Sequence, residues 1–503
     1  MNETARLSSI SSQPPTMAKR KREAEEALSG NEQLKSRKTE RAGSMTASIQ
    51  IITGSYERVL HGITATISDP PSSDPNSTVQ FADTFLFNAH ASAIRCLALS
   101  ALSDPSSKQS PSILLASGGT DERINVYSLS AVPPLDNEKL ASIPSLGGNK
   151  ISENPRNREL GSLMHHSASI TSLHFPTRSK LLSAAEDNTI AISRTNDLSV
   201  VSTIKAPHPK VQGRPSGDTA PPGAAPAGVN DFAIHSSMKL MLSVGKGERC
   251  VRLWNLVTGK KAGVLNFSRQ MLQSVHEGKY NSGEGRRIEW NPKGEEFAVA
   301  FERGAVIFGA DSKPKSKILP TPSTKLHQMR YLTISDDDGQ DMVMLAVSTE
   351  GGKILFYSTE QTSQDKEAGS SETSLPDSAY LAQLDGKADG VVGRIKDFEI
   401  IPIPSSTHTF SDLLAVTAGS DGRVRIWMMH TRDFLSVKAN REKLSKPIPV
   451  GDLIGTYETR SRITCLKAFV MVQREGDGGL SDFEGLTEDA ESANDSSDED
   501  RLE

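Results

Sequence analysis

The sequence predicts an all-β repeat fold, a seven-bladed β-propeller closed by pairing between its first and last strands. Three observations predict it. Short β-branched runs of about four to eight residues recur from Ile49 onward, Gly, Ser, Asp and Asn separate these runs, and the body has no long stretch of helical periodicity. The chain of 503 residues is long enough for one large repeat architecture.

Four segments align as units of one repeat, beginning near His90, His165, Val229 and Ile395. Each unit supplies two inner strands and a third strand after a tight turn. In three units an acidic residue at this turn lies six positions before an aromatic residue, and the pairs are Asp121 and Tyr127, Glu248 and Trp254, and Asp421 and Trp427. We expect the carboxylate to cap the turn and the ring to fill space between neighbouring blades.

The second unit departs from this pattern. Asp187 stands at the turn and His166 precedes the first strand, but Ser193 and Arg194 occupy the place of the aromatic residue. Weaker units begin near Arg287 and His327. Degenerate units are tolerated in such folds because a blade is held by its neighbours.

Closure of the ring follows from counting the units. Six full units lie between about residues 89 and 460, so the two ends must share the seventh. The run from Ile463 to Val470 has the pattern of an innermost strand with no strands after it, and the runs at 49–53, 59–64 and 85–87 supply the other three. Their pairing removes an exposed sheet edge.

Composition divides the chain into three parts: a disordered basic arm at 1–47, the propeller at 48–473 and a disordered acidic tail at 474–503. The formal net charge is −5, the tail carries twelve acidic and two basic side chains, and 36% of all residues are hydrophobic. Long loops are expected at about 130–158, 206–227 and 359–378, which are rich in Pro, Gly, Ser or charge.

Both terminal segments contain candidate signals. The basic clusters resemble a nuclear localisation signal and comprise Lys19, Arg20, Lys21, Arg22, Lys35, Arg37 and Lys38. A solvated charge run is the alternative. Four tail serines, each with a carboxylate three residues downstream, are candidates for phosphorylation, namely Ser481, Ser492, Ser496 and Ser497. A merely solvating tail is equally compatible with this composition.

No catalytic or cofactor-binding constellation is present. The sequence lacks a phosphate-binding loop, a zinc-protease motif and a nucleophile elbow, so we expect no enzyme activity, no cofactor and no small-molecule substrate. Adjacent His165 and His166 on one strand would face opposite ways and lack a further ligand, so we expect no metal site. Three scattered cysteines exclude a disulfide framework, and no apolar run is long enough to cross a membrane.

The repeat residues resemble the WD40 family, in which His90 and His166 would be structural histidines. Several segments resemble one subfamily more specifically: Ile52-Thr-Gly-Ser-Tyr-Glu, Phe87-Asn-Ala-His, Ser117-Gly-Gly-Thr-Asp-Glu, His165-His-Ser and Arg252-Leu-Trp-Asn-Leu. It is the PAK-interacting protein family, and the likeness spans about residues 49 to 310.

This resemblance implies a nucleolar, and therefore nuclear, scaffold for large-ribosomal-subunit assembly and pre-rRNA maturation. Its partners would be ribosomal and ribosome-assembly proteins. The alternative is a signalling adaptor that binds and negatively regulates a p21-activated-type protein kinase. The body is nearly neutral and has no basic stripe interleaved with aromatic residues, so we expect RNA contact to be indirect or weak.

Overall fold

We analysed a computed structural model of the chain. It describes residues 46–68, 78–104, 110–133, 143–144, 150–208, 228–278, 281–335, 340–362, 375–386, 393–403, 412–440 and 447–472. The segment Met1–Gly43 lies outside these residues. Almost all of the predicted arm and all of the predicted tail also lie outside them.

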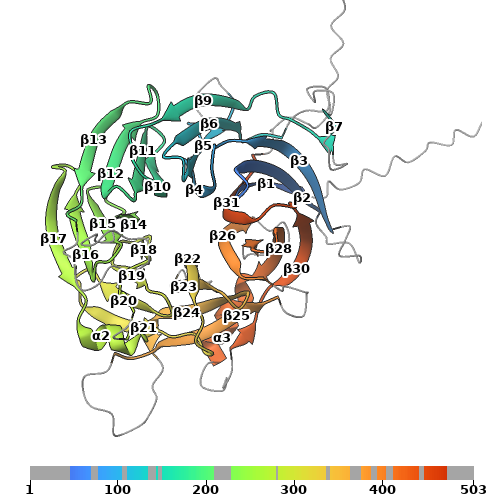
Figure 1. Cartoon of the computed structure of the whole chain (residues 1–503). Helices are drawn as coiled ribbons and strands as arrows, with labels where there is room; N and C mark the ends of the chain where they lie inside the picture. Colours follow the sequence, from blue (N-terminus) through green and yellow to red (C-terminus); the bar gives the residue numbers. More distant parts are fainter. Residues whose placement is uncertain are drawn as a thin grey trace, which may run out of the picture. The chain divides into compact units, whose positions relative to one another are not determined.

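The described residues from 46 to 472 form seven antiparallel blades around a central channel (Figure 1), which confirms the predicted fold class. The closing blade contains β31 (Ile463–Val470), β1 (Thr46–Ser55), β2 (Val59–Ser68) and β3 (Val79–Asn88). From the channel outward, blade 1 contains β4 (Ile94–Leu99), β5 (Ser112–Gly119), β6 (Ile124–Ser130) and β9 (Arg158–Leu163). Blade 2 contains β10 (Ile170–Thr177), β11 (Lys180–Ala185), β12 (Thr189–Arg194) and β13 (Val200–Lys205). Blade 3 contains β14 (Val229–Ile234), β15 (Leu240–Gly245), β16 (Cys250–Asn255) and β17 (Lys260–Asn266).

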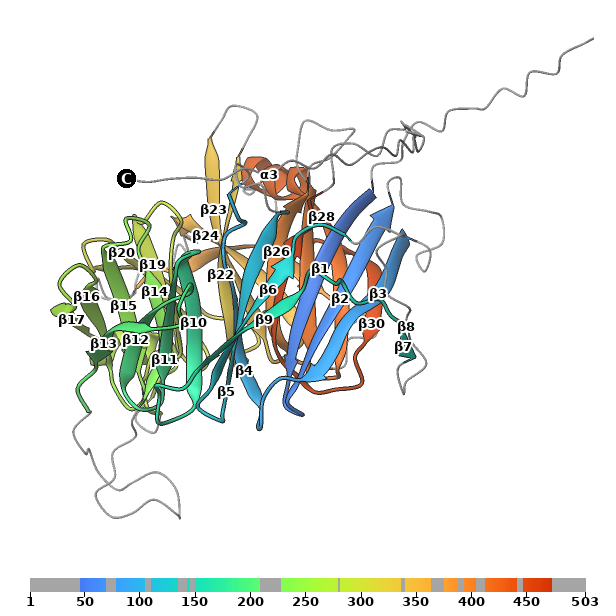
Figure 2. The ribbon, with the colours of Figure 1, turned by 90° about the horizontal axis from the view of Figure 1, so that it is seen from above.

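Blades 4 to 6 complete the ring. Blade 4 contains β18 (Arg287–Trp290), β19 (Glu296–Ala300), β20 (Ala305–Gly309) and β21 (Pro314–Ile318). Blade 5 contains β22 (Leu326–Ser335), β23 (Asp341–Thr349), β24 (Lys353–Thr362) and β25 (Ser378–Asp385). Blade 6 contains β26 (Ile395–Ile403), β27 (Asp412–Gly419), β28 (Arg423–His430) and β30 (Asp452–Glu458). Two helices are described, α2 (Arg269–Ser274) and α3 (Thr431–Asn440), and Figure 2 shows α3 at one end of the blades. No helix in the described ranges is long and apolar enough to span a membrane.

Burial explains the run of apolar residues in the second strand of each blade. In β5 every residue after Ser112 is buried, because neighbouring blades cover both faces of the sheet. The outermost strand β13 buries only Ile204. Apolar clusters therefore fill the spaces between consecutive blades, as where Trp427 of blade 6 packs with Phe356 of blade 5.

The ring closes as the sequence predicts, by antiparallel pairing of β31 with β1. The register runs from Ile49 opposite Val470 to Ser55 opposite Ile463. The Thr464 hydroxyl donates to the carbonyl oxygens of Gly54, at 2.9 Å, and of Ile94, at 2.6 Å. This one side chain therefore joins the last strand to the closing blade and to blade 1.

The segment predicted as a loop at 130–158 differs in part from the expectation. Two short strands, β7 (Ile143–Pro144) and β8 (Lys150–Ile151), extend the closing blade at its outer edge. The Ser152 amide donates to the Asp83 carbonyl oxygen at 2.7 Å, so the free edge of β3 captures this part of the insert. A third short strand, β29 (Ile448–Pro449), adds to the edge of β25 in the same way. Most of the loops predicted at 206–227 and 359–378 lies outside the described residues.

Candidate functional site

The predicted turn residues of blade 1 form one polar cluster. Nδ1 of His90 lies 2.9 Å from the Asp121 carboxylate, and Nε2 lies 2.8 Å from the Ser117 hydroxyl. The Ala91 amide donates to the same carboxylate at 2.9 Å. Burial opposes ionisation, but these hydrogen bonds lower the pKa of Asp121. The Tyr127 ring packs in the apolar cluster between the closing blade and blade 1.

Blade 2 repeats this cluster without the aromatic residue. His166 lies 3.1 Å from Asp187 and 2.8 Å from Ser183, and Asp187 also accepts the Thr189 hydroxyl at 2.6 Å. Burial opposes ionisation, but His166 and Thr189 hold the pKa of the Asp187 carboxyl well below its usual range. Ser193 is buried and its hydroxyl has no hydrogen-bond partner in the described part of the chain.

Blades 3 and 6 replace the histidine by an arginine four residues after the acid. Glu248 pairs with Arg252, and Asp421 pairs with Arg425 at 2.6 Å. The ring of Trp427 donates to the Thr417 hydroxyl at 3.1 Å. In the same way, Trp254 donates to Ser243 at 2.8 Å.

The predicted turn acids thus sit in separate blades, and each is engaged by partners within its own blade. Among the described residues, no three His, Cys, Asp or Glu side chains converge as metal ligands. The basic cluster at 19–38 and the four tail serines lie outside the described residues, so they remain predictions.

Sequence reasoning missed the central channel, a cavity of about 450 Å³ lined by the innermost strands of all seven blades. Its wall is polar and charged. The charged residues are Arg95, Asp231, Arg287, Glu289, Arg330, Lys396, Asp397, Glu399 and Lys467, together with His174. A cavity with this lining can receive a polar or charged group of a partner.

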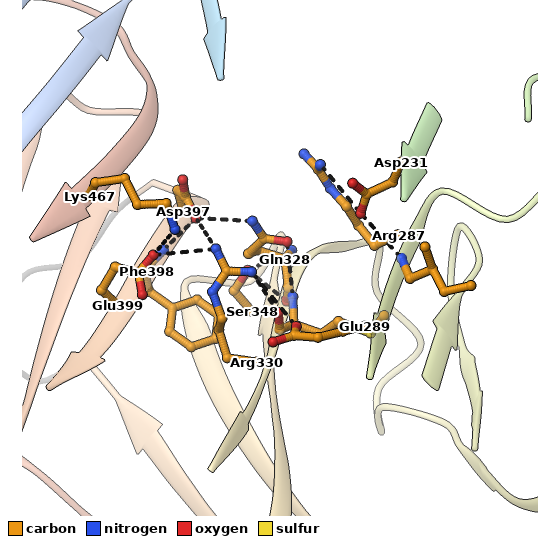
Figure 3. A network of polar contacts seen from close by, with 12 residues as sticks. Asp231, Arg287, Glu289, Gln328, Arg330, Ser348, Asp397, Phe398, Glu399 and Lys467 are labelled. Carbon is orange, nitrogen blue, oxygen red and sulfur yellow. Dashed lines mark hydrogen bonds and ion pairs between the residues drawn. The ribbon is translucent and has the colours of Figure 1, made fainter. Parts of the chain in front are cut away.

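Arg330 is the centre of a charge network in this wall (Figure 3). Its guanidinium lies 3.4 Å from Glu399, 3.7 Å from Glu289 and 3.9 Å from Asp397. Lys467 also pairs with Glu399. These contacts connect β18, β22, β26 and β31, so the network joins blades 4, 5 and 6 to the closing blade.

The network also extends to backbone groups. Asp397 accepts the Gln328 side chain at 3.2 Å and the Leu466 amide at 2.9 Å. Asp231 plays the same part in blade 3, where it accepts the Ile288 amide at 3.2 Å. Each carboxylate therefore fastens its blade to the next one.

The pKa values follow from burial and from the alternation of charge. Burial disfavours the charged form of Arg330, but Glu399 and Glu289 raise its pKa further than burial lowers it. Burial likewise opposes ionisation of Glu399, yet Lys467 and Arg330 lower its pKa. Burial raises the pKa of Glu289 to about 7, because Arg330 compensates only in part and Glu399 adds repulsion.

The sequence signal for the channel is a charged or polar residue on the innermost strand of a blade, and it can be recognised only after the blades have been assigned. Residues His174, Glu289, Arg330, Glu399 and Lys467 all point into the channel from innermost strands. In the sequence they stand among ordinary alternating strand residues.

Comparisons with known proteins match this architecture. A family model described as WD domain, G-beta repeat matches residues 157–192. The protein MAK11 of Saccharomyces cerevisiae is 28% identical over 82% of this chain and 86% of its own length. The p21-activated protein kinase-interacting protein 1-like of Gallus gallus is 23% identical over 84% of this chain and 80% of its own. The human p21-activated protein kinase-interacting protein 1 is 25% identical over 47% of this chain and 44% of its own. The resemblance indicated by the repeat motifs is confirmed.

Proposed function

Because the chain is a WD40-repeat protein, similar over most of its length to PAK-interacting proteins, we propose that it is a non-enzymatic scaffold for assembly of the large ribosomal subunit. It acts in pre-rRNA maturation, in the nucleolus, through contacts with ribosomal and ribosome-assembly proteins. It uses no cofactor.

The observation that carries this proposal is the similarity to the yeast protein MAK11, which covers more than four fifths of both chains. The family resemblance in the sequence motifs implies that fungal members act in making the large subunit. Similarity over this share of both chains extends far beyond one repeat, so it favours a shared scaffold over a shared single repeat.

The geometry of the blades supports a binding role. The turn acids Asp121, Asp187 and Asp421 are each engaged by a histidine or an arginine of the same blade. The channel network around Arg330 joins neighbouring blades to one another. Polar groups used in this way rigidify a platform whose loop-lined faces are available to partners.

The proposal is tested by sedimentation and depletion. The tagged full chain, expressed from its own locus, is followed through a sucrose gradient of cell extract, and precursor rRNA is measured after depletion. Co-migration with large-subunit precursors and accumulation of unprocessed precursor rRNA are expected. A small free complex with normal rRNA processing would refute the proposal.

A second candidate function is supported by the animal relatives, which are named as p21-activated protein kinase-interacting proteins. In this alternative the chain binds and negatively regulates a p21-activated-type protein kinase. Purified chain would then lower the activity of such a kinase in a reconstituted assay, and the tagged protein would be mostly cytosolic.

The terminal segments supply a further test of location. We propose that the clusters at Lys19–Arg22 and Lys35–Lys38 direct nuclear import. Replacing these basic residues by alanine is expected to move the tagged protein to the cytosol, and unchanged nuclear signal would contradict the proposal.

A further inference from the structure

Four loops meet on one end of the propeller, beside the place where the ring closes. They are residues 55–58, 393–396, 420–423 and 458–462, and we call their exposed surface the seam face. Backbone hydrogen bonds hold the loops together. Tyr56 donates to Arg462 and Thr459 to Gly422, each at 2.9 Å. Ser420 donates to Arg394, also at 2.9 Å. Figure 1 shows the blades that contribute these loops, with β26, β28 and β30 next to β1 and β31.

The seam face is rich in arginine. Its cationic side chains are Arg58, Arg394, Lys396, Arg423, Arg460 and Arg462. The carboxylates near them are Glu57, Glu350, Asp421 and Glu458. Asp421 is already paired with Arg425, and Glu350 faces Arg394 at 3.4 Å. The cations therefore outnumber the carboxylates that remain to neutralise them.

Lys396 and His327 lie at the inner margin of the face, where burial and neighbouring cations both disfavour a further positive charge. Lys396 has no ion pair within the described part of the chain, and burial, Arg394 and Arg462 lower its pKa. The pKa of the neighbouring His327 is lowered to about 4, mainly by burial and then by the charges of Lys396 and Arg394, which Glu350 opposes. Positive charge that the protein leaves uncompensated favours an anionic partner.

An aromatic ring stands among these cations. Tyr56 is 60% exposed, and the guanidinium carbon of Arg462 lies 5.6 Å from its ring centroid. A planar guanidinium over an exposed ring offers a stacking surface for an unpaired base, while the other arginines can bind phosphates. An acidic peptide would use the charges but gain less from the ring.

We propose that the seam face binds single-stranded RNA, with Tyr56 and Arg462 stacking on a base and the surrounding arginines contacting the backbone. The physical argument points to single-stranded nucleic acid, and the choice of RNA rests on the proposed function. Sequence reasoning missed this surface because its residues come from four separate loops and form no basic stripe.

The test is fluorescence anisotropy of a labelled twelve-nucleotide oligouridylate with the purified full chain. Arg462→Ala and Tyr56→Ala are each expected to weaken binding about tenfold, within the range for loss of one stacking or phosphate contact. Arg423→Ala, which removes one of the arginines assigned to the RNA backbone, should reduce the dependence of log K on log salt by about 0.7 for the lost phosphate contact. The control is Arg303→Ala. Arg303 is an exposed arginine in the turn between β19 and β20 of blade 4, which corresponds to the seam-face turn at 420–423 between β27 and β28 of blade 6. This variant should bind like wild type.

Competitors and melting temperatures complete the design. Equal weakening by Arg303→Ala, or no binding by the folded wild-type chain, would overturn the proposal. Each variant should have the melting temperature of wild type, so that a loss of binding is not a loss of folding. Competition by an oligoglutamate of the same charge as effectively as by RNA would assign the face to acidic peptides instead. Tighter binding of oligodeoxyuridylate than of oligouridylate would refute RNA as the ligand. Because binding is measured with pure components, failure here leaves the gradient experiment independent, and failure of the gradient experiment leaves this result standing.

Discussion

Replacing Asp421 by alanine is expected to destabilise the propeller more than the equivalent replacement of Asp121. Both acids occupy the turn before the third strand of a blade, but their partners differ. Asp421 faces Arg425, whose side chain is 3% exposed. Asp121 faces His90, which is also buried. A guanidinium cannot lose its proton in a protein, whereas an imidazole can become neutral.

The magnitude follows from what remains after each substitution. Removing one partner of a buried ion pair costs about 3–5 kcal/mol. The Asp421 side chain is 21% exposed, so solvent places the expected cost at the lower end, about 3 kcal/mol. Asp121→Ala leaves the His90 ring nitrogen and the Ala91 amide without their acceptor, but it leaves no obligatory charge, so the expected cost is about 1–2 kcal/mol. At an unfolding entropy of roughly 0.7 kcal/mol/K for a body of this size, the two variants should melt about 4 °C and about 2 °C below wild type.

Differential scanning calorimetry of both variants measures this difference. The matched rescue is Asp421→Ala combined with Arg425→Met, which removes the buried charge and should recover at least half of the loss. Equal melting temperatures for the two single variants, or a double variant no more stable than Asp421→Ala, would refute the reasoning.

Three further outcomes follow from the structure. Because the folded pKa of Glu289 is raised to about 7, its stabilising protonation is complete below about pH 4.5 and is lost as pH rises through about 7. Glu289→Gln should therefore be more stable than wild type at pH 8, by roughly 3 kcal/mol. Denaturant melts in which the stability difference between the two proteins is the same at pH 5 and pH 8 would contradict this. Deleting residues 461–473 should give an aggregating chain because β1 loses its partner, and a soluble monomer by light scattering would contradict this. Burial raises the pKa of the Cys96 thiol to about 12 and also raises the pKa values of the Cys250 and Cys465 thiols. The native protein should therefore react slowly with a thiol reagent, and rapid labelling before unfolding would contradict this prediction.

The fold was predictable because its signal is local and repeated. The spacing from Asp421 to Trp427 reports a tight turn followed by a strand that packs on the preceding blade, and the same spacing recurs at Glu248 and Trp254. Closure was predictable because an innermost strand at Ile463–Val470 had no strands after it, and the structure pairs it with β1.

The channel and the seam face were not predictable, because they combine residues that no local pattern relates. Arg330 and Lys467 are far apart in sequence, and each occupies one ordinary strand position. The arginine that replaces the histidine could have been noticed, since Arg252 and Arg425 both lie four residues after the turn acid. The capture of β8 by the edge of β3 depends on a single register pair, which composition cannot specify.

The pairing of β1 with β31 also sets the order of events during synthesis. Thr464 must find Gly54, which is 410 positions earlier in the chain. At a translation rate of about 5–20 residues per second, β1 waits roughly 20–80 s before its partner strand is made. Throughout that interval an apolar strand edge is open to other chains, so a nascent-chain chaperone that covers β1 is expected to determine the yield of folded protein.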